Sequence, residues 1–295
     1  MNPNILIAVP CYNEEVTIGS VVLRAYSYGD HVVVIDDGST DRTADIAMLA
    51  GAEVIRHGVN KGKGAGIKTA FEHAKRVNAN ILVFLDGDGQ HNPDEIPRLI
   101  APLLSYEADI VNGSRFLEKD HHHVPAYRRI GQEVLTLLTN AGSGRKVTDS
   151  QSGFRAFSRK TFDSFSFTET GMGIESEMLM DAASANLQVK EVQIDVRYDV
   201  EGSTFNPVTH GIRVVGTVIK RLVRPRQHLI SGIPGLLLLI TGIAMFNVLM
   251  LMLLSMMNDI VIDYAIIAVL SIVFGVLAYI LLAARKPENI DQAGR

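Results

Sequence analysis

Two aspartates one residue apart, Asp86 and Asp88, have the spacing in this 295-residue chain that best fits metal chemistry. They lie in the segment DGDGQH, at the end of the apolar run Ile81–Leu85. Carboxylates at i and i+2 in a turn can converge on Mg²⁺ or Mn²⁺, which commonly link carboxylates to substrate phosphates. Gly87 and Gly89 allow a tight turn and close approach to a ligand. An ordinary Asp/Gly turn is the alternative, but polar clusters at neighbouring strand ends favour the metal site.

Three of those polar clusters are PCYNEE from Pro10, DDGSTD from Asp36 and GSR from Gly113. In DDGSTD, Asp37 is a candidate acceptor for a nucleobase or ribose, although Asp and Ser are also common turn and cap residues. Residues 60–66 are rich in Gly and Lys and open a predicted helix. They are either a phosphate cradle or a Gly-rich turn packed under the nucleotide. No Ser or Thr follows Gly-Lys as a Walker A motif requires.

A basic constellation lies further along the chain. Arg128 and Arg129 open a helix-like stretch, and DSQSGFR follows from Asp149. A helix dipole favours anions at the helix N-terminus, so it does not explain arginines at that position. Two arginines there suit a phosphate ester that arrives from the membrane. A solvated arginine pair is the alternative. Asp149 is a candidate base, a structural cap or a partner for Arg128 or Arg129. The adjacent histidines 121–123 cannot easily face one ion and are interpreted as a solvated loop.

The elements that must position these residues alternate between strand-like and helix-like stretches, which predicts an open, doubly wound α/β sheet. The predicted parallel strands are Ile5–Val9, Val32–Ile35, Ile81–Leu85 and Ile110–Val111. The predicted helices are Glu15–Tyr26, Asp41–Ala50, Lys63–Arg76 and Pro93–Tyr106, and the predicted N-caps are Thr40 or Asp41, and Asn92. Ligands of such sheets bind beyond the carboxyl ends of the strands, where the polar clusters lie.

Composition excludes several classes of protein. Hydrophobic residues make up 47% and charged residues 20%, so a disordered chain is excluded. The net charge of −4 argues against a nucleic-acid binder, and the single cysteine, Cys11, excludes a disulfide framework or a Cys-based zinc cluster. Mean hydropathy is +0.18. The apolar excess lies in two uncharged stretches, Leu229–Met257 and Tyr264–Ala284, each long enough to cross a hydrocarbon core of about 30 Å. Buried helices of a soluble core would need a polar face.

Charges around these stretches predict their orientation. Basic residues precede the first stretch and follow the second, whereas the loop between them has only acidic charges. The positive-inside rule therefore places both ends in the cytoplasm. Ile212–Arg224 has the pattern of an amphipathic helix on an anionic membrane, with a core-facing helix as the alternative. We expect a cytoplasmic domain over 1–208, an interfacial helix over 209–227 and a transmembrane hairpin with a short cytoplasmic tail over 228–295.

Taken together, PCYNEE, DDGSTD, DGDGQH, GSR and DSQSGFR resemble glycosyltransferase family 2 in order and spacing, over residues 4–205. The resemblance implies the GT-A fold, a Rossmann-like, doubly wound mixed sheet, here followed by the amphipathic helix and two transmembrane helices. The two apolar stretches narrow it to polyprenyl-phosphate glycosyltransferases, similar to dolichyl-phosphate mannose, glucose or N-acetylglucosamine synthases. RYDVEGST from Arg197, followed by Asn206 and Pro207, is similar to the archaeal branch.

The resemblance also implies roles for particular residues. Residues implied to bind the nucleotide sugar are Pro10, Tyr12, Glu14, Asp37, Asp86, Gly87, Asp88, Gln90 and Arg197. Those implied to surround Mg²⁺ or Mn²⁺ are Asp86, Asp88 and Gln90. The lipid phosphate would be bound by Arg115, Arg128 and Arg129, and the catalytic set would be Asp88, Asp149, Arg115 and Arg129. Related chains often have Lys where Phe205 stands here, so another residue must supply that cationic contact or it is missing.

The implied reaction is metal-dependent, inverting transfer from a UDP- or GDP-linked hexose or N-acetylhexosamine to polyprenyl (dolichyl) phosphate, for protein or surface glycosylation. The acceptor phosphate is already ionised near neutral pH, so positioning should supply most of the rate. A polysaccharide synthase is an alternative, but those usually carry more spans and a Q-x-x-R-W segment, and this chain has no Trp. A non-catalytic, membrane-tethered nucleotide-sugar binding protein is another. The expected partners are the nucleotide-sugar donor, the polyprenyl (dolichyl) phosphate and the lipid bilayer, and no nucleic acid is expected. A homo-oligomer is possible.

Overall fold

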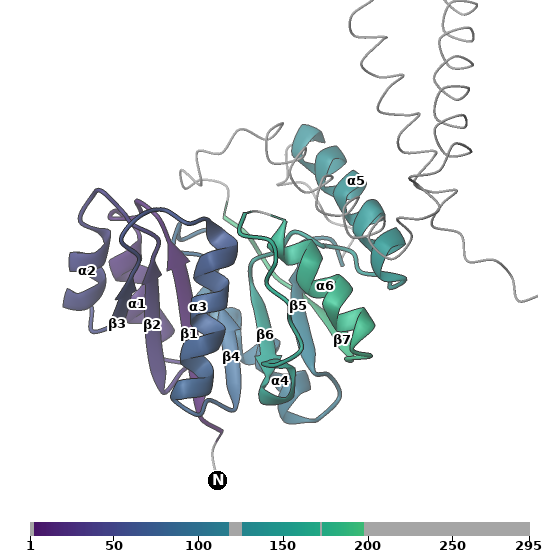
Figure 1. The fold of residues 1–295 in the computed structure, drawn as a ribbon, viewed down its shortest axis with the longest axis horizontal. Coiled ribbons are helices and arrows are strands. Elements are labelled where there is room, and N and C mark those ends of the chain that lie inside the picture. The colour runs from purple at the N-terminus through teal and green to yellow at the C-terminus, as the bar shows by residue number, and fades with distance from the viewer. Residues whose placement is uncertain (1–2, 118–125, 172, 198–295) are drawn as a thin grey trace, which may run out of the picture. The chain divides into compact units, whose positions relative to one another are not determined.

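Seven strands form one mixed sheet in the order β3-β2-β1-β4-β6-β5-β7 (Figure 1). The computed structural model describes residues 3–117, 126–171 and 173–197, and of 126–131 the helical backbone alone. The strands are β1 (Ile5–Cys11), β2 (His31–Asp36), β3 (Glu53–Arg56), β4 (Ile81–Phe84), β5 (Ile110–Ser114), β6 (Arg155–Ser158) and β7 (Val189–Gln193). All neighbouring pairs are parallel except those of β6, which is antiparallel to β4 and β5. The predicted mixed α/β sheet is thus confirmed.

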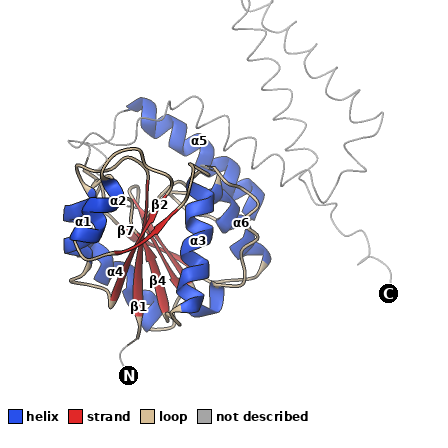
Figure 2. Ribbon diagram, turned by 60° about the vertical axis from the view of Figure 1, so that its left-hand side comes forward, coloured by secondary structure: helices blue, strands red, loops and turns tan. Residues whose placement is uncertain are grey.

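Helices cover both faces of this sheet (Figure 2). They are α1 (Ile18–Ala25), α2 (Thr43–Leu49), α3 (Lys63–Arg76), α4 (Ile96–Leu104), α5 (Ala126–Ser143) and α6 (Ile174–Ser184), with 3₁₀ turns at Pro93–Glu95 and Arg159–Thr161. Because side chains alternate along a strand, Ile7 and Val9 of β1 pack with α1, α2 and α4, and Leu6 and Ala8 pack with α3 and α6. Helix α5 packs against α6.

The core on the α3 face is aromatic. Phe71 of α3 lies among five other phenylalanine rings, with centroids 5.1 to 5.7 Å from its own. Tilted and edge-on pairs at such distances add to the free energy gained from burial. This cluster fixes α3 against β4 and β6, and with it the segment that precedes α3.

The four predicted strands are present, and each predicted helix has a counterpart, three of them with different ends. The prediction for α3, Lys63–Arg76, is confirmed. The first predicted helix starts later, at Ile18, because Thr17 and Ile18 donate backbone hydrogen bonds to the Glu14 carbonyl in a preceding turn. The segment after Asn92 divides into a 3₁₀ turn and α4, and Asn92 caps it as predicted by accepting from the Asp94 amide.

The cap predicted for α2 was wrong. Arg42, not Thr40 or Asp41, occupies the N-cap position, and it makes no capping side-chain hydrogen bond. The carboxylate of Asp41 instead accepts from the Thr43 amide at 3.0 Å, two residues on. A short side chain of this kind competes for backbone amides in a turn as readily as it caps a helix.

Within the ranges that the structure describes, no helix is both long enough and apolar enough to cross a bilayer. The two predicted spans, the predicted interfacial helix and the boundaries at 208/209 and 227/228 lie outside those ranges, as do histidines 121–123 and Phe205. The domain limits and the topology therefore stay predictions.

Candidate active site at the carboxyl edge of the sheet

Segments far apart in the sequence meet where β1, β2 and β4 end. The Asp37 amide donates to the Cys11 carbonyl at 3.0 Å, and the Thr17 hydroxyl donates to the Gly87 carbonyl at 2.7 Å. A Cβ added to Gly87 would lie 2.9 Å from the Cβ of Cys11, so only glycine fits there without a shift. The predicted convergence of PCYNEE, DDGSTD and DGDGQH is therefore present in the fold.

Three carboxylates crowd this edge. Burial and the nearby Asp86 raise the pKa of Asp88 to about 6. Burial, with Asp88 and Asp86, raises the pKa of Glu14 to about 7. One oxygen of Asp88 accepts from the Gln90 amide at 3.0 Å, so Gln90 is held in the same loop. Carboxylates that raise one another's pKa in this way form a site that a cation would stabilise.

A lysine supplies part of the missing positive charge. The ammonium of Lys63, the first residue of α3, lies 3.0 Å from Asp86 Oδ1 and 2.9 Å from Glu175 Oε1. Burial disfavours charge on both partners, but the attraction between them outweighs it: the pKa of Asp86 is lowered and that of Lys63 raised. Lys63 belongs to the segment predicted as a phosphate cradle or a Gly-rich turn, and its side chain is directed to a carboxylate.

A buried histidine closes the other side of Asp86. The His91 ring stacks on Phe154, with centroids 5.2 Å apart, and its Nδ1 lies 3.6 Å from Asp86 Oδ2. Burial lowers the pKa of His91 to about 4, so the ring is neutral at pH 7. The same loop reaches Arg197, whose amide donates to the Gln90 carbonyl at 2.9 Å.

The donor set fits a divalent ion that binds together with a phosphate ligand. Asp86, Asp88 and Gln90 supply oxygen atoms, the ligand type that Mg²⁺ and Mn²⁺ prefer. In the described part of the chain no three or more His, Cys, Asp or Glu side chains are grouped as a metal site. Such ions are often held by one or two carboxylates and completed by substrate phosphates and water. Two carboxylates and an amide are therefore sufficient.

Asp37 lies beside this cluster but its carboxylate is already engaged. It is buried, and it contacts His57 Nδ1 at 2.7 Å and accepts from the amides of Lys61 and Gly62 at 3.0 and 2.7 Å. Gly62 has φ +94°, a conformation that favours glycine. Asp37 thus shapes the turn that starts α3, and its predicted contact with a nucleotide stays a prediction. Tyr12, after β1, is 40% exposed, so part of its ring is open to a ligand.

The basic constellation is built around an ion pair. Arg115 donates from Nε and Nη2 to the two oxygens of Asp149, at 2.6 and 2.8 Å, and Asp149 is fully buried. Burial opposes ionisation of Asp149, but Arg115 outweighs it and holds its pKa below the usual value. Asp149 thus has Arg115 as its partner, a pairing that the sequence did not predict, and the predicted pairing with Arg128 or Arg129 stays a prediction. Arg128 and Arg129 lie in the first turn of α5, with side chains outside the described part.

Sequence comparison decides the family. The sequence model of the family Glycosyl transferase family 2 matches residues 6–165.

The chain belongs to glycosyltransferase family 2.

UDP-N-acetylglucosamine–dolichyl-phosphate N-acetylglucosaminyltransferase of Methanococcus voltae is 34% identical over an alignment of 216 residues that covers 66% of this chain and 86% of the relative. Dolichyl-phosphate hexose transferase of Haloferax volcanii is 28% identical over 228 residues, 77% of this chain and 97% of the relative. Among solved structures, glucosyl-3-phosphoglycerate synthase from Mycobacterium tuberculosis in complex with Mn²⁺ and UDP-glucose matches with TM-score 0.61 and 26% identity, over 75% of this chain and 79% of the other. The predicted membership and enzyme class are confirmed.

Several site residues of this glycosyltransferase escaped sequence reasoning. A Cβ on Gly153 would lie 2.4 Å from Asp86 Oδ2, so the glycine of DSQSGFR makes room for the first aspartate of DGDGQH. Arg155 is fully buried and donates to the carbonyls of Ser150, Ser152 and Glu175. Gly153 and Arg155 both lie in DSQSGFR, one of the motifs that carry the family resemblance. Membership in that motif was therefore the sequence signal that could have identified them. No comparable signal pointed to Glu175.

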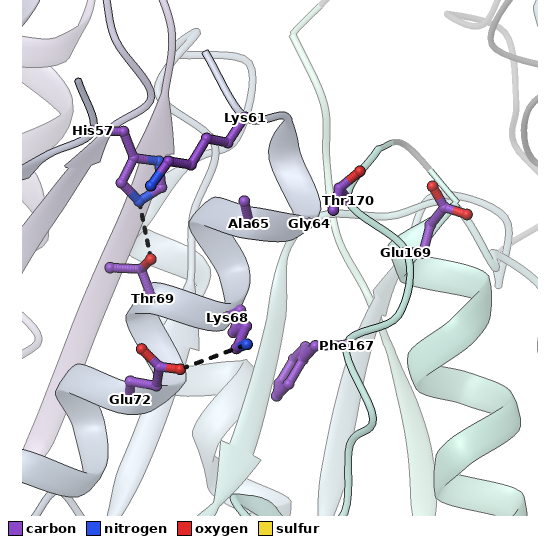
Figure 3. A pocket seen from close by; sticks show the side chains of 10 residues that line it. All are labelled: His57, Lys61, Gly64, Ala65, Lys68, Thr69, Glu72, Phe167, Glu169 and Thr170. Atoms are coloured by element: carbon purple, nitrogen blue, oxygen red, sulfur yellow. Dashed lines mark hydrogen bonds and ion pairs between the residues drawn. The ribbon is translucent and has the colours of Figure 1, made fainter. Parts of the chain in front are cut away.

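A hollow of about 330 Å³ lies along α3 (Figure 3). It is lined by His57, Lys61, Gly64, Ala65, Lys68, Thr69, Glu72, Phe167, Glu169 and Thr170. Three of these belong to the predicted cradle segment 60–66, and no other predicted site residue lines the hollow. Its charged side chains partly cancel, since Lys68 pairs with Glu72 at 4.0 Å. His57 connects this hollow to the site: one nitrogen of its ring lies 3.0 Å from the Thr69 hydroxyl oxygen, and the other contacts the Asp37 carboxylate.

Proposed function

We propose that this glycosyltransferase transfers a hexose or N-acetylhexosamine from a UDP- or GDP-linked donor to polyprenyl (dolichyl) phosphate, with inversion at the anomeric carbon. The observation that carries the proposal is the meeting of the Glu14, Asp86 and Asp88 carboxylates with the Arg115–Asp149 pair at one edge of the sheet. The charge of Arg115 helps to lower the pKa of Asp86, so the two groups belong to one electrostatic site. The two dolichyl-phosphate relatives support the acceptor.

On the donor side, Pro10 and Tyr12 would flank the base, and Gly87 would let the DGDGQH backbone approach the diphosphate. Asp86, Asp88 and Gln90 would hold Mg²⁺ or Mn²⁺, which supplies charge neutralisation for the departing nucleoside diphosphate. The complex of the mycobacterial enzyme with Mn²⁺ and UDP-glucose supports a divalent ion and makes UDP-sugars the first donors to test.

The diphosphate also needs a cationic contact from the protein. Arg197 would provide it, because the backbone hydrogen bond between its amide and the Gln90 carbonyl places its residue beside the DGDGQH loop. This arginine precedes the position where Phe205 replaces the lysine common in related chains. Arg197 therefore offers one route by which this chain keeps a positive charge near the leaving group.

On the acceptor side, Arg115, Arg128 and Arg129 would bind the lipid phosphate. A phosphate monoester is largely dianionic at pH 7, because its second pKa is about 6. Its oxygen can attack without a strong protein base, so orientation carries the step. Asp149 would act by holding the Arg115 guanidinium in one orientation. In-line attack would convert an α-linked donor into a β-linked lipid-phosphate sugar.

We further propose that the enzyme is a cell-membrane protein with two spans, Leu229–Met257 and Tyr264–Ala284, and a cytoplasmic catalytic domain. The uncharged length of both stretches and the basic residues that flank them support this topology. It would bring the acceptor arginines to the surface at which a polyprenyl phosphate is presented.

The direct test is a panel of radiolabelled UDP- and GDP-sugars, each incubated with membranes that contain the full chain, dolichyl phosphate and Mn²⁺. We expect the sugar of one donor to enter the organic-extractable lipid fraction. UDP-N-acetylglucosamine is the first donor to test. Label that enters a polymer would indicate a polysaccharide synthase. Binding of a nucleotide sugar without transfer to lipid would overturn the proposed reaction.

The acceptor assignment has its own test in Arg129→Gln. Loss of a hydrogen bond to a charged group costs about 1.5–3 kcal/mol, which is a loss of roughly tenfold to a hundredfold in lipid efficiency. Donor affinity should stay at the wild-type value. If the variant loses donor affinity and keeps its dependence on lipid, the two sites are reversed.

A further inference from the structure

The start of α3 fixes the position of Lys63. Gly62 adopts φ +94°, and the Gly64 amide donates to the Thr170 carbonyl at 2.8 Å. A Cβ on Gly64 would lie 2.2 Å from the Glu169 carbonyl oxygen, so the backbone on both sides of Lys63 is packed closely against residues 169–170. The lysine side chain therefore starts from an anchored backbone, and its ammonium lies between two carboxylates of different elements.

These two carboxylates are not equivalent. Asp86 belongs to the DGDGQH loop, and one of its oxygens faces Lys63 while the other faces His91. Glu175, in the first turn of α6, is 4% exposed, and its Oε2 is buried without a hydrogen-bond partner. Glu175 therefore has an unused acceptor, and it can hold the ammonium by itself when Asp86 is engaged elsewhere.

We propose that Lys63 is an internal counter-ion that competes with the divalent metal for Asp86 and is retained by Glu175 when the metal is bound. The inference rests on the proposed function, because it concerns the metal that Asp86 and Asp88 would hold. Lys63 keeps its proton throughout, and one ion pair of Asp86 is exchanged for another. Lys63 is a positioning residue, since it acts through Asp86.

The consequence is an order of binding. Before the donor arrives, the lysine neutralises Asp86, and a metal that binds alone must displace that ion pair. A nucleoside diphosphate brings its own negative charges, which compensate both the metal and the ammonium. The metal should therefore bind weakly by itself and more tightly together with the diphosphate.

Two single substitutions should change metal affinity in opposite directions. Lys63→Met removes the competitor, so Mn²⁺ alone should bind about tenfold more tightly or better, because an opposite charge at this distance changes the proton affinity of a carboxylate by roughly tenfold or more. Glu175→Gln removes the charge that holds the ammonium away from Asp86, so Mn²⁺ should bind more weakly. The matched control is Lys68→Met, on the same helix, whose partner Glu72 lies 4.0 Å away.

The measurement is a Mn²⁺ titration of the detergent-solubilised full chain without donor, in which the electron paramagnetic resonance signal reports free Mn²⁺. The double variant Lys63→Met/Glu175→Gln should bind like Lys63→Met, and it keeps the charge balance, so it guards against misfolding of the single variant. A purely structural lysine would weaken binding in both single variants, which would overturn the proposal.

Two failures can be told apart. If no variant binds Mn²⁺, alone or with UDP, both the metal assignment and the role of Lys63 are refuted. If the wild type binds Mn²⁺ and transfers sugar, but neither Lys63→Met nor the double variant binds Mn²⁺ more tightly, only the role of Lys63 is refuted.

Discussion

Replacing Asp149 with Asn should destabilise the catalytic domain and release Arg115. The wild-type carboxylate is fully buried and accepts two hydrogen bonds from the guanidinium, at 2.6 and 2.8 Å. Asn has nearly the same shape, but it has no charge and its NH₂ group would face a guanidinium that has only donors. Removal of one partner from a buried ion pair costs about 3–5 kcal/mol.

The lower end of that range is expected, because the Arg115 side chain is 14% exposed and can regain some water. A loss of about 3 kcal/mol should lower the melting temperature of a domain of this size by roughly 6–12 °C. The matched control is Asp163→Asn, since Asp163 pairs with Lys75 at the surface and its side chain is 88% exposed. Exposed pairs contribute little to stability, so this control should melt like the wild type.

The stability difference between the wild type and Asp149→Asn should depend on pH, and the pKa of Asp149 gives the direction of that dependence. Arg115, acting against burial, holds the pKa of Asp149 below its usual value. A carboxyl group with a lowered folded pKa stabilises the fold above its unfolded pKa, and this contribution is lost as the pH falls through the folded value. The gap between wild type and Asp149→Asn should therefore be full at pH 7 and shrink below about pH 4.

The assay is differential scanning fluorimetry of the full chain in detergent between pH 3 and pH 8, beside lipid and donor kinetics. The variant should need more lipid phosphate for half-maximal rate and bind the donor normally. A melting temperature equal to that of the control, or a gap that persists undiminished at low pH, would refute a buried ion pair at Asp149.

Three further predictions use the same site and the flanking chain. Asp88→Ala should abolish transfer while the protein still folds and inserts, and EDTA should do the same to the wild type; near wild-type transfer in either case would contradict the metal assignment. Gly153→Ala should displace Asp86, which its Cβ would approach to 2.4 Å, and weaken Mn²⁺ binding with UDP, whereas Gly58→Ala, with no atom within 4 Å, should behave as wild type. A cysteine that replaces Asn258 should be labelled by an impermeant reagent in intact cells, because the loop is predicted to lie outside. Labelling only after permeabilisation would contradict this topology.

The donor half of the site could be predicted from sequence because its signals are local. Each of β1, β2 and β4 is an apolar run followed by a polar cluster, and parallel strands bring their carboxyl ends to one edge. The edge location of Asp86 and Asp88 followed from these two facts. What the sequence could not show was that Lys63, from a segment predicted as a phosphate cradle or a turn, pairs with Asp86, because that contact depends on the packing of α3 against residues 169–170.

Helix α6 shows why other parts were missed. Its buried residues include Glu175, Glu177 and Asp181, so no apolar stripe at helical spacing stands out in the sequence. These acids are tolerated because the fold supplies partners: Glu177 accepts from the amides of Thr168 and Glu169 at 3.0 and 2.7 Å. Strands β3, β6 and β7 were missed for a related reason, since each is short and carries charged residues within it.

The antiparallel strand β6 has a consequence for synthesis of the chain. It fills the gap between β4 and β5, pairing Phe84 with Arg155, so β4 lacks its second neighbour until a further 71 residues have been added. At roughly 5–20 residues per second the ribosome needs about 4–14 s for that length. During this interval the nascent chain presents an apolar strand with an open edge, a template for pairing with another chain. Newly made enzyme should therefore depend on chaperones most strongly between the emergence of β4 and that of β6.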